Sequence, residues 1–363
     1  MIGIDRRLLQ NVDWPLIGTG LGFAVLSGIT LSSLHVGRAG GTVAFRQVAW
    51  FGIGLVALLI VASIDYKKLV RIAPLIYVLG LAGLMAVFVL GRTVSGARRW
   101  IVIGSVSVQP SELFKLAFVL MAVWVLTSRW AQPISRFTLL LVLPVAVIPF
   151  VLIMKQPDLG TALLLFPVLL ALLVGAGIQL RLLGGLALAG LAALPVAWFV
   201  MKEYQRERIF VYLDPFRDPL GTAYNVIQAK IAIGSGQLLG KGVSGATQSR
   251  LAFLPERHTD FIFAVFAEMW GFVGCLILLS CYAFVLLRGF DIAASTHEPI
   301  GRLVALGATS MLGAQVLINV GMVSGLLPVV GVPLPLMSYG GTSVLCSLMG
   351  LGLLVSVRMR QFQ

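Results

Sequence analysis

The sequence predicts an all-α integral membrane protein with ten transmembrane helices and one large extracytoplasmic loop between helices 7 and 8. Of the 363 residues, 59% are hydrophobic and only 11% are charged, whereas a soluble domain needs about a quarter charged residues to cover its surface. The apolar residues gather in runs that approach or reach the roughly 20 residues that one bilayer-spanning helix needs. Lipid is therefore the expected solvent for most side chains.

Ten apolar runs follow one another along the chain. They are Trp14–Ser33, Val48–Ile64, Ile72–Leu90, Leu113–Leu126, Phe137–Met154, Leu159–Gly177, Leu182–Met201, Phe261–Leu287, Leu303–Leu326 and Thr342–Val357. The fourth run reaches spanning length only if it starts at Pro110, which places Glu112 and Lys115 at membrane depth. An even number of spans puts both termini on the same side of the membrane.

Basic residues in short loops predict the orientation, because cytoplasmic loops carry more Lys and Arg than outer loops. With the N-terminus inside, the cytoplasmic ends hold Arg6, Arg7, Lys67, Lys68, Arg71, Arg129, Arg136, Arg181, Arg288, Arg302, Arg358 and Arg360. The short outer loops hold fewer, namely Arg38, Arg46, Arg92, Arg98, Arg99 and Lys155. We therefore expect both termini in the cytoplasm.

The chain reads as one domain, 1–363, in which residues 202–260 form the one substantial polar segment, expected outside. The net charge of +13 indicates basic side chains facing anionic head groups rather than nucleic acid. This segment is basic, although the orientation rule gives no reason for basic residues on the outer side. Its basic residues are Lys202, Arg206, Arg208, Arg217, Lys230, Lys241, Arg250 and Arg257. Within it, Thr222–Ile233 suits an amphipathic helix that lies at the interface or packs onto the spans.

Ionisable residues at membrane depth mark function by default, and Glu112, Lys115, Asp158 and Glu268 stand at such positions. Glu112 and Lys115 are three apart, so they share a helix face. They form either a structural ion pair or the lining of a polar cavity at the outer face. Asp158 follows Pro157, which is typical of a helix start. It serves either as a cap or as part of a site.

Asp260 stands at the outer membrane boundary beside Arg257 and His258. It is either a simple helix-start acid or a carboxylate that takes a proton from a hydroxyl while nearby cations hold a diphosphate. The stretch 331–343 then breaks the helical pattern. Non-helical backbone near membrane depth is tolerated only against protein or a water-filled cavity. This stretch is therefore either an ordinary hairpin or a cavity wall.

Cofactor motifs are lacking. The cysteines Cys275, Cys281 and Cys346 lie inside apolar runs without metal-ligand spacing, and the histidines are scattered. There is no P-loop and no dinucleotide glycine fingerprint. The sequence therefore predicts no organic cofactor and no zinc site.

Several distinctive motifs follow one another along the chain. They are 96–100, Gln109-Pro110-Ser111-Glu112, Lys155–Thr161, Asp214-Pro215, 218–221, 245–249, 254–263 and Asn319–Ser343. Together they resemble the SEDS family (shape, elongation, division and sporulation) over nearly the whole chain. Its rod-shape branch is favoured by Asp13-Trp14-Pro15-Leu16 and by Glu256–Phe263. One departure is visible, because Glu268 is followed by Met269 where a second acid is expected.

The resemblance implies a peptidoglycan glycosyltransferase that polymerises lipid II at the outer face of the bacterial cytoplasmic membrane for cell elongation and rod shape. The partners it implies are lipid II, a class B penicillin-binding protein acting as transpeptidase, other elongation-complex proteins and membrane lipids. In the family, the aspartate that matches Asp260 is required for activity. We expect it to activate the acceptor hydroxyl for attack with inversion.

The diphosphate-binding residues that we expect are Arg99, Lys115, Arg208 and Lys230. Other substrate-binding candidates are Gln109, Ser111, Glu112, Lys155, Asp158, Arg257, His258, Thr259 and Ser343. A Mg²⁺ or Mn²⁺ ion suits carboxylates next to a diphosphate, although the sequence has no dedicated metal motif. Two other functions stay open: a lipid II flippase or other lipid transporter, and a scaffold that only holds the penicillin-binding partner.

Overall fold

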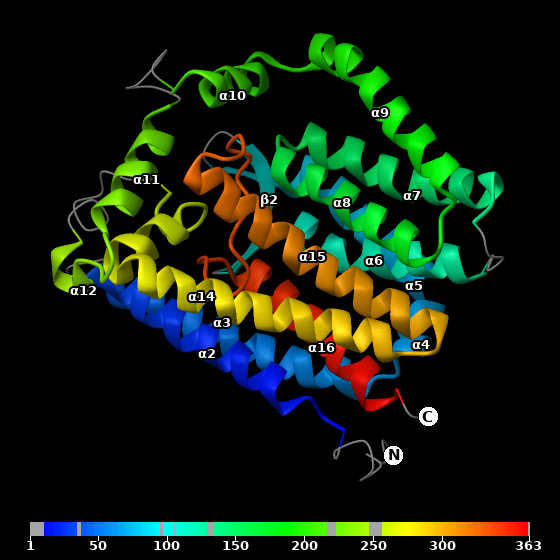
Figure 1. Ribbon diagram of the computed structural model, residues 1–363, viewed down its shortest axis with the longest axis horizontal. Helices are drawn as coiled ribbons and strands as arrows, with labels where there is room; N and C mark the ends of the chain where they lie inside the picture. Colours follow the sequence, from blue (N-terminus) through cyan, green and yellow to red (C-terminus); the bar gives the residue numbers. More distant parts are fainter. Residues whose placement is uncertain are drawn as a thin grey trace.

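The computed structural model describes residues 11–34, 38–94, 97–104, 106–128, 134–215, 223–246 and 256–361. Some residues used in the sequence analysis lie outside this description. They are the basic residues Arg6, Arg7, Arg129, Arg217 and Arg250 and parts of the motifs at 96–100, 218–221, 245–249 and 254–263. Most of the described chain is helical (Figure 1).

The helices that carry the apolar runs are α2 (Trp14–Ser33), α3 (Arg38–Ser63), α5 (Ala73–Leu90), α6 (Pro110–Ser128), α7 (Arg136–Lys155), α8 (Leu159–Gly175), α9 (Leu180–Val200), α14 (Ile262–Ser295), α15 (Pro299–Ser324) and α16 (Gly341–Met359). Shorter helices are α4 (Tyr66–Arg71), α10 (Glu203–Leu213), α11 (Tyr224–Ser235) and α12 (Gly242–Gly245).

Among the described residues, 8 helices are long and apolar enough to cross a membrane: α2, α3, α5, α6, α7, α14, α15 and α16. The apolar stretches Leu159–Gly175 and Leu180–Val196, in α8 and α9, are shorter. Each of the ten runs read from the sequence overlaps one of these ten helices. The predicted class is confirmed in its main feature, because the described chain is nearly all helical and has several helices able to span a bilayer. The count of ten crossings stays a prediction.

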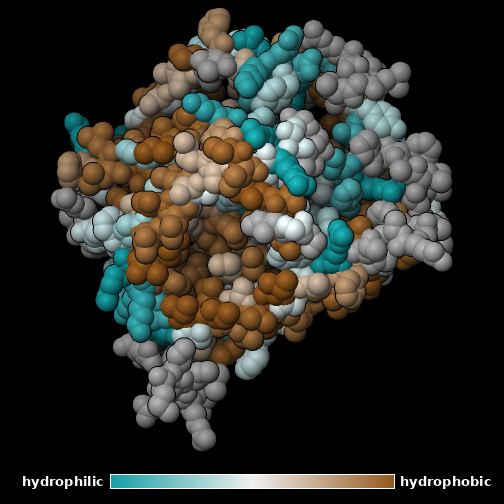
Figure 2. Space-filling model, turned by 180° about the vertical axis from the view of Figure 1, so that it is seen from behind, coloured by the Kyte–Doolittle hydropathy of each residue, from teal (hydrophilic) through white to brown (hydrophobic). Residues whose placement is uncertain are grey.

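The outer surface of the bundle is apolar. Figure 2 shows hydrophobic side chains over most of one face, with hydrophilic ones gathered toward its margins. Leu59, Val89, Leu140 and Phe272 are among the exposed large side chains. An exposed apolar surface of this extent is unfavourable in water, so it fits a helix bundle that lipid surrounds. Helix α9 lies at the edge of the bundle (Figure 1) and is exposed around most of its circumference.

Helices α6, α15 and α16 form the interior of the bundle. Glycine allows α16 to approach α3, and α15 to approach α6, closely, as is common between membrane helices. A Cβ atom on Gly352 of α16 would lie 2.8 Å from the main-chain oxygen of Leu58 in α3. A Cβ on Gly307 of α15 would lie 2.6 Å from a methyl carbon of Val119 in α6. Larger residues at either position would push these helices apart.

A small antiparallel sheet between α5 and α6 was not predicted from the sequence. Its strands are β1 (Arg92–Val94), β2 (Ala97–Ile103) and β3 (Val106–Val108), with β2 in the centre. The run of β-branched and aromatic residues Trp100–Ile103 favours a strand, but its shortness concealed it among the apolar runs. The sheet places Arg99 at one end of the bundle, next to the start of α6.

Helix α14 is broken at Gly271, whose φ of 64° is not helical. The amides that lose their helical acceptors find others in the loop after α11: Phe272 N donates to Gln237 O at 2.8 Å, and Val273 N donates to Leu238 O at 3.0 Å. Lys241 Nζ also lies 3.7 Å from the buried Glu268 carboxylate. The first segment of α14 is therefore a short separate helix held by the segment 236–241.

Helix α11 confirms the helix expected near 222–233, and it packs against α14 and α15. Its buried residues Ala229 and Ala232 form part of the main core. Of the two arrangements considered from the sequence, packing onto the spans is the one observed.

Both ends of the described chain lie at the C-terminal end of α14. Arg288 Nε lies 2.8 Å from Asp13 Oδ2, just before α2, and Gln361 Nε2 donates to Ser295 O at 3.0 Å. Asp260 lies just before the N-terminal end of α14, opposite to the two chain ends. Helices α10, α11 and α12 also lie at that opposite end (Figure 1).

Candidate active site

Helices α6, α8 and α16 begin at one place, where hydrogen bonds join them. Gln109 N donates to Thr342 Oγ1 at 3.2 Å, which joins α6 to α16. Gln109 Nε2 and Ser111 Oγ each donate to Asp158 Oδ2 at 2.9 Å, which joins α6 to α8. Since each helix presents the positive end of its dipole at its N-terminus, this arrangement favours an anion nearby.

Asp158 caps α8, which is one of the two roles considered for it, and its role in a site stays a prediction. Its Oδ1 accepts from Thr161 N at 3.3 Å, so it caps α8 as predicted. Its other oxygen accepts from Gln109 and Ser111, and the residue is 2% exposed. The carboxylate is therefore held in place by Gln109 and Ser111, the two residues that flank Pro110. It links the starts of α6 and α8 as well as capping α8.

Asn319 fixes the main chain at Asp260. Its Nδ2 donates to Asp260 O at 2.9 Å and to Val332 O at 2.7 Å. The asparagine itself is completely buried in α15. One side chain thus joins α15, the start of α14 and the non-helical stretch that follows α15.

The stretch 331–340 is held on both sides. Tyr339 N donates to His258 O at 2.7 Å, and Ser338 Oγ donates to Thr259 O at 2.5 Å. From the other side, Gln47 Nε2 donates to Ser338 O at 3.0 Å. This non-helical backbone is packed against protein, as backbone at membrane depth must be, and it forms one wall beside Asp260.

The carboxylate of Asp260 lies over the bare backbone of Gly331. A Cβ atom at Gly331 would lie 3.1 Å from Asp260 Oδ2, and the φ of 75° also favours glycine. Gly331 O would in turn lie 3.2 Å from a Cβ on Gly160, in the first turn of α8. Asp260 is therefore packed close to the same helix starts that surround Asp158.

The pKa of Asp260 is raised from 3.8 to about 6, chiefly because burial removes water from its carboxylate. The charges of Glu256 and Asp158 raise it further, whereas Arg99 and Arg208 lower it. A carboxylate with a pKa near the working pH is suited to accept a proton in catalysis.

Two arginines from separate elements supply positive charge at Asp260. Arg99 belongs to β2, and its buried Nε has no hydrogen-bond partner among the described residues. Arg208 belongs to α10, with its guanidinium carbon 5.9 Å from the centre of the Tyr204 ring. Both are among the four residues that we expected at the diphosphate, and both act on Asp260.

Glu112 and Lys115 form the predicted ion pair in α6. Lys115 Nζ lies 2.7 Å from Glu112 Oε2, and both residues are 2% exposed. A pair so deeply buried orients the start of α6, which carries Gln109 and Ser111. Their contact with substrate stays a prediction.

The remaining predicted residues are distributed unevenly. Arg257, His258 and Thr259 form the half-buried turn before Asp260. Ser343 lies in the first turn of α16, where its buried Oγ has no partner in the described part of the chain. Lys155 is exposed at the end of α7. Lys230 lies on α11, in a separate cavity discussed below.

The sequence did not single out Asn319, Gly331 or Thr342 individually. Asn319 did carry a usable signal, because an amide inside the apolar run Leu303–Leu326 needs a buried partner. Its partners are main-chain carbonyls, which no sequence pattern identifies. The described residues contain no group of three or more His, Cys, Asp or Glu side chains able to hold a metal ion.

The chain is similar to known proteins over most of its length. The FtsW, RodA and SpoVE model of cell cycle proteins matches residues 14–363. The peptidoglycan glycosyltransferase MrdB of Escherichia coli (strain K12) is 44% identical over 313 residues, which cover 86% of this chain and 84% of that protein.

Solved structures extend the similarity to the whole chain. One, described as "Structural coordination of polymerization and crosslinking by a peptidoglycan synthase complex", is 33% identical with a TM-score of 0.82, covering 97% of this chain and 99% of the other. The rod shape determining protein RodA of Thermus thermophilus is 30% identical with a TM-score of 0.72, covering 97% and 98%. The family expected from the motifs is confirmed, and the chain belongs to the FtsW, RodA and SpoVE family of cell cycle proteins.

Proposed function

We propose that this protein is a peptidoglycan glycosyltransferase that polymerises lipid II into glycan strands for cell elongation and rod shape. The observation that carries the proposal is the position of Asp260, a carboxylate with a pKa of about 6 under the influence of Arg99 and Arg208. It lies where helix starts converge. The relative MrdB, 44% identical, is itself named a peptidoglycan glycosyltransferase.

The reaction joins an acceptor hydroxyl to the anomeric carbon of a lipid-linked donor. The carboxylate of Asp260 accepts the hydroxyl proton as the oxygen forms its bond to that carbon. The bond from the carbon to the diphosphate oxygen breaks, and its electron pair leaves on the diphosphate. A single displacement of this kind inverts the anomeric carbon. The proton then passes from Asp260 to water, which restores the carboxylate.

The leaving diphosphate gains negative charge as the bond breaks, and cations placed there stabilise the transition state. Arg99 and Arg208 are the residues suited to this role, because an arginine can bind phosphate oxygens through two parallel hydrogen bonds. Arg99 Nε is buried and has no partner in the described chain, so it retains a donor for a ligand. The N-termini of α6 and α16 add partial positive charge.

A divalent ion is a separate proposal. The described residues supply no ready-made cluster of ligands, and so they do not fit a resident metal site. We propose that Mg²⁺ or Mn²⁺ arrives with the diphosphate, whose oxygens it prefers. The displacement described above uses only side chains of this chain.

We also propose the topology expected from the sequence: ten crossings of the bacterial cytoplasmic membrane, both termini in the cytoplasm, and residues 202–260 outside. The supporting observation is that Asp260 and the two chain ends lie at opposite ends of α14. Basic side chains such as Lys67 and Arg360 lie at the end of the bundle where the two chain termini are found. Basic residues mark the cytoplasmic side.

The proposed partner is a class B penicillin-binding protein that cross-links the new strands. A similar structure is described as a complex that coordinates polymerization and crosslinking. Other elongation-complex proteins and the surrounding lipids would complete the assembly, in which lipid II is the substrate.

The proposal is tested with purified protein, its partner and labelled lipid II, with glycan ladders resolved on a gel. Asp260→Asn should abolish the ladders while expression and partner binding are unchanged. Glu203→Gln, which removes another carboxylate from the outer segment, should leave them intact. Full ladders from Asp260→Asn would refute the proposed role of this residue.

The flippase and scaffold alternatives predict other outcomes in the same experiment. A flippase would move labelled lipid II across a vesicle membrane without joining it. A scaffold would support no ladders beyond those of its partner alone. Either result with the unsubstituted protein would contradict the proposed activity.

A further inference from the structure

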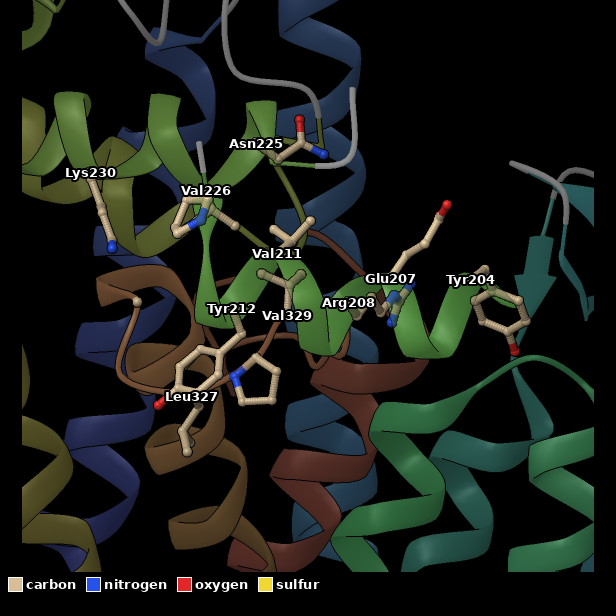
Figure 3. A pocket seen from close by; sticks show the side chains of 13 residues that line it. Tyr204, Glu207, Arg208, Val211, Tyr212, Asn225, Val226, Lys230, Leu327 and Val329 are labelled. Atoms are coloured by element: carbon tan, nitrogen blue, oxygen red, sulfur yellow. The ribbon is translucent and has the colours of Figure 1, made fainter. Parts of the chain in front are cut away.

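A cavity of about 310 Å³ lies between α10, α11 and the segment that follows α15. Its size falls in the range of small-ligand sites. Polar and charged side chains at its rim include Tyr204, Glu207, Arg208, Asn225 and Lys230. Figure 3 shows Lys230 and Arg208 on opposite sides of this cavity, with Val211 and Val226 between them.

The cavity is built from packed elements. Val211 of α10 and Val226 of α11 are buried in one small cluster with Ala223, and Val329 packs against it. Tyr212 Oη donates to Leu326 O at 3.1 Å, which joins α10 to the segment after α15. The walls are therefore tied to the same segment that continues to Gly331 and the active site.

Lys230 is held across the backbone of Gly325. A Cβ atom on Gly325 would lie 2.2 Å from Lys230 Cε and 2.5 Å from its Nζ, and the φ of 79° also favours glycine. No acidic side chain in the described ranges forms a salt bridge with Lys230. Its ammonium group therefore keeps its charge available for a ligand in the cavity.

Arg208 connects the cavity with Asp260. It lines the cavity, and its charge also lowers the pKa of Asp260. Lys230 lines the same cavity on the side opposite Arg208 (Figure 3). The cavity thus extends from Arg208, whose charge acts on Asp260, to a second cation.

The proposed reaction needs two lipid-linked diphosphates at once. The diphosphate of the donor is bonded to the carbon under attack, so it must lie beside Asp260. The substrate that supplies the hydroxyl carries its diphosphate at the other end of its sugars. A second cationic position is therefore required at the distance of two sugar rings from the reacting atoms.

We propose that this cavity binds the diphosphate end of the substrate that supplies the attacking hydroxyl, with Lys230 as its principal cation. The inference rests on the proposed function and adds a second substrate site to it. Arg208 would lie between the two diphosphates and contact that of the donor, as proposed above. An anionic phospholipid head group has related chemistry, and the experiment separates the two ligands.

The test counts lipid II molecules bound to the Asp260→Asn protein in detergent by native mass spectrometry. This background removes turnover. We expect two bound molecules, one in the Lys230→Met protein, and two in the Lys202→Met control, which removes an exposed lysine of the same segment. Lys230→Arg should restore the second molecule. Two molecules on Lys230→Met, or displacement of one by phosphatidylglycerol at equal concentration, would overturn the proposal.

A kinetic measurement uses the otherwise unsubstituted protein with its partner. Lys230→Met should raise the KM for lipid II roughly tenfold, as loss of one charge-assisted contact does, with kcat changed less than twofold. A loss of kcat at unchanged KM would contradict a binding role. If the unsubstituted protein made no polymer, the proposed function would fail, whereas the count of bound molecules would still decide the role of the cavity.

Discussion

The side-chain amide of Asn319 donates to the main-chain carbonyl of Asp260 and, from the same nitrogen, to that of Val332. Because Asp260 precedes the first turn of α14, its position depends on this link between helices. Asn319→Leu should leave the buried carbonyl of Val332 and the partly buried carbonyl of Asp260 without this donor. An unsatisfied buried carbonyl costs about 1–3 kcal/mol. We expect polymer formation to fall roughly 100-fold, the effect of a small misplacement of a catalytic group.

The control for Asn319 lies one helical turn away. Gln315 is also buried in α15, and its side-chain amide has no hydrogen-bond partner among the described residues. Gln315→Met should therefore leave activity unchanged and stability equal or higher. The measurements are glycan ladders and thermal unfolding in detergent. Equal losses from both substitutions would show that any change in α15 is harmful and would remove the specific role of Asn319.

The buried pair Glu112–Lys115 allows a double-mutant cycle. Glu112→Gln or Lys115→Met alone leaves one uncompensated charge among apolar neighbours, which costs about 3–5 kcal/mol for buried pairs. The double variant should be less destabilised than either single variant. Thermal unfolding in detergent measures all three. Unchanged stability with lost activity in Glu112→Gln would instead indicate a direct catalytic role.

Composition and run length were sufficient to predict the ten long helices, because lipid-facing helices need long apolar runs. Their ends were predicted less well. Trp14–Ser33 was predicted to the residue, but α3 begins at Arg38 rather than Val48 and α14 continues to Ser295 rather than Leu287. The break at Gly271 was not predicted, since the amides freed there are satisfied by Gln237 and Leu238 from another part of the chain. Long-range partners of this kind leave no local pattern.

The candidate site was predicted in part for the same reason. Asp158, Asp260 and the Glu112–Lys115 pair were recognisable, because charge at membrane depth is costly and needs a role. Two features depend on three-dimensional packing alone. They are the small sheet that carries Arg99 and the backbone contact between Gly331 and Asp260. Sequence reasoning therefore supplied the charged groups, whereas the structure supplied their arrangement.

Gly331 is expected to be the most sensitive glycine of the site. Gly331→Ala would place a methyl group 3.1 Å from Asp260 Oδ2, so the carboxylate must move. We expect at least a tenfold loss of polymer formation. The control is Gly104→Ala, which has a similar φ of 62° but no atom within 4 Å of its Cβ. It carries the same backbone strain, about 1 kcal/mol, and should keep its activity.

The raised pKa of Asp260 predicts two effects of opposite sign. As the base, Asp260 must be ionised, so activity should rise with pH through about 6. The folded state favours the protonated carboxyl, so this group contributes stability below pH 3.8 that is lost as the pH rises through about 6. Asp260→Asn should consequently raise the unfolding temperature more at pH 7.5 than at pH 5. A smaller gain at pH 7.5 would contradict the raised pKa.

Arg99 and Asp158 should move the pH profile in opposite directions. Burial is the main cause of the raised pKa of Asp260, but Arg99 lowers it and Asp158 raises it. Arg99→Gln should therefore shift the midpoint of activity to higher pH, and Asp158→Asn should shift it to lower pH. Asp158→Asn also weakens the hydrogen bonds from Gln109 and Ser111, so its maximal rate should fall as well. The midpoint is the decisive measurement, because a purely structural defect would lower the rate without moving it. Shifts in the same direction would show that neither charge acts on Asp260 as the geometry requires.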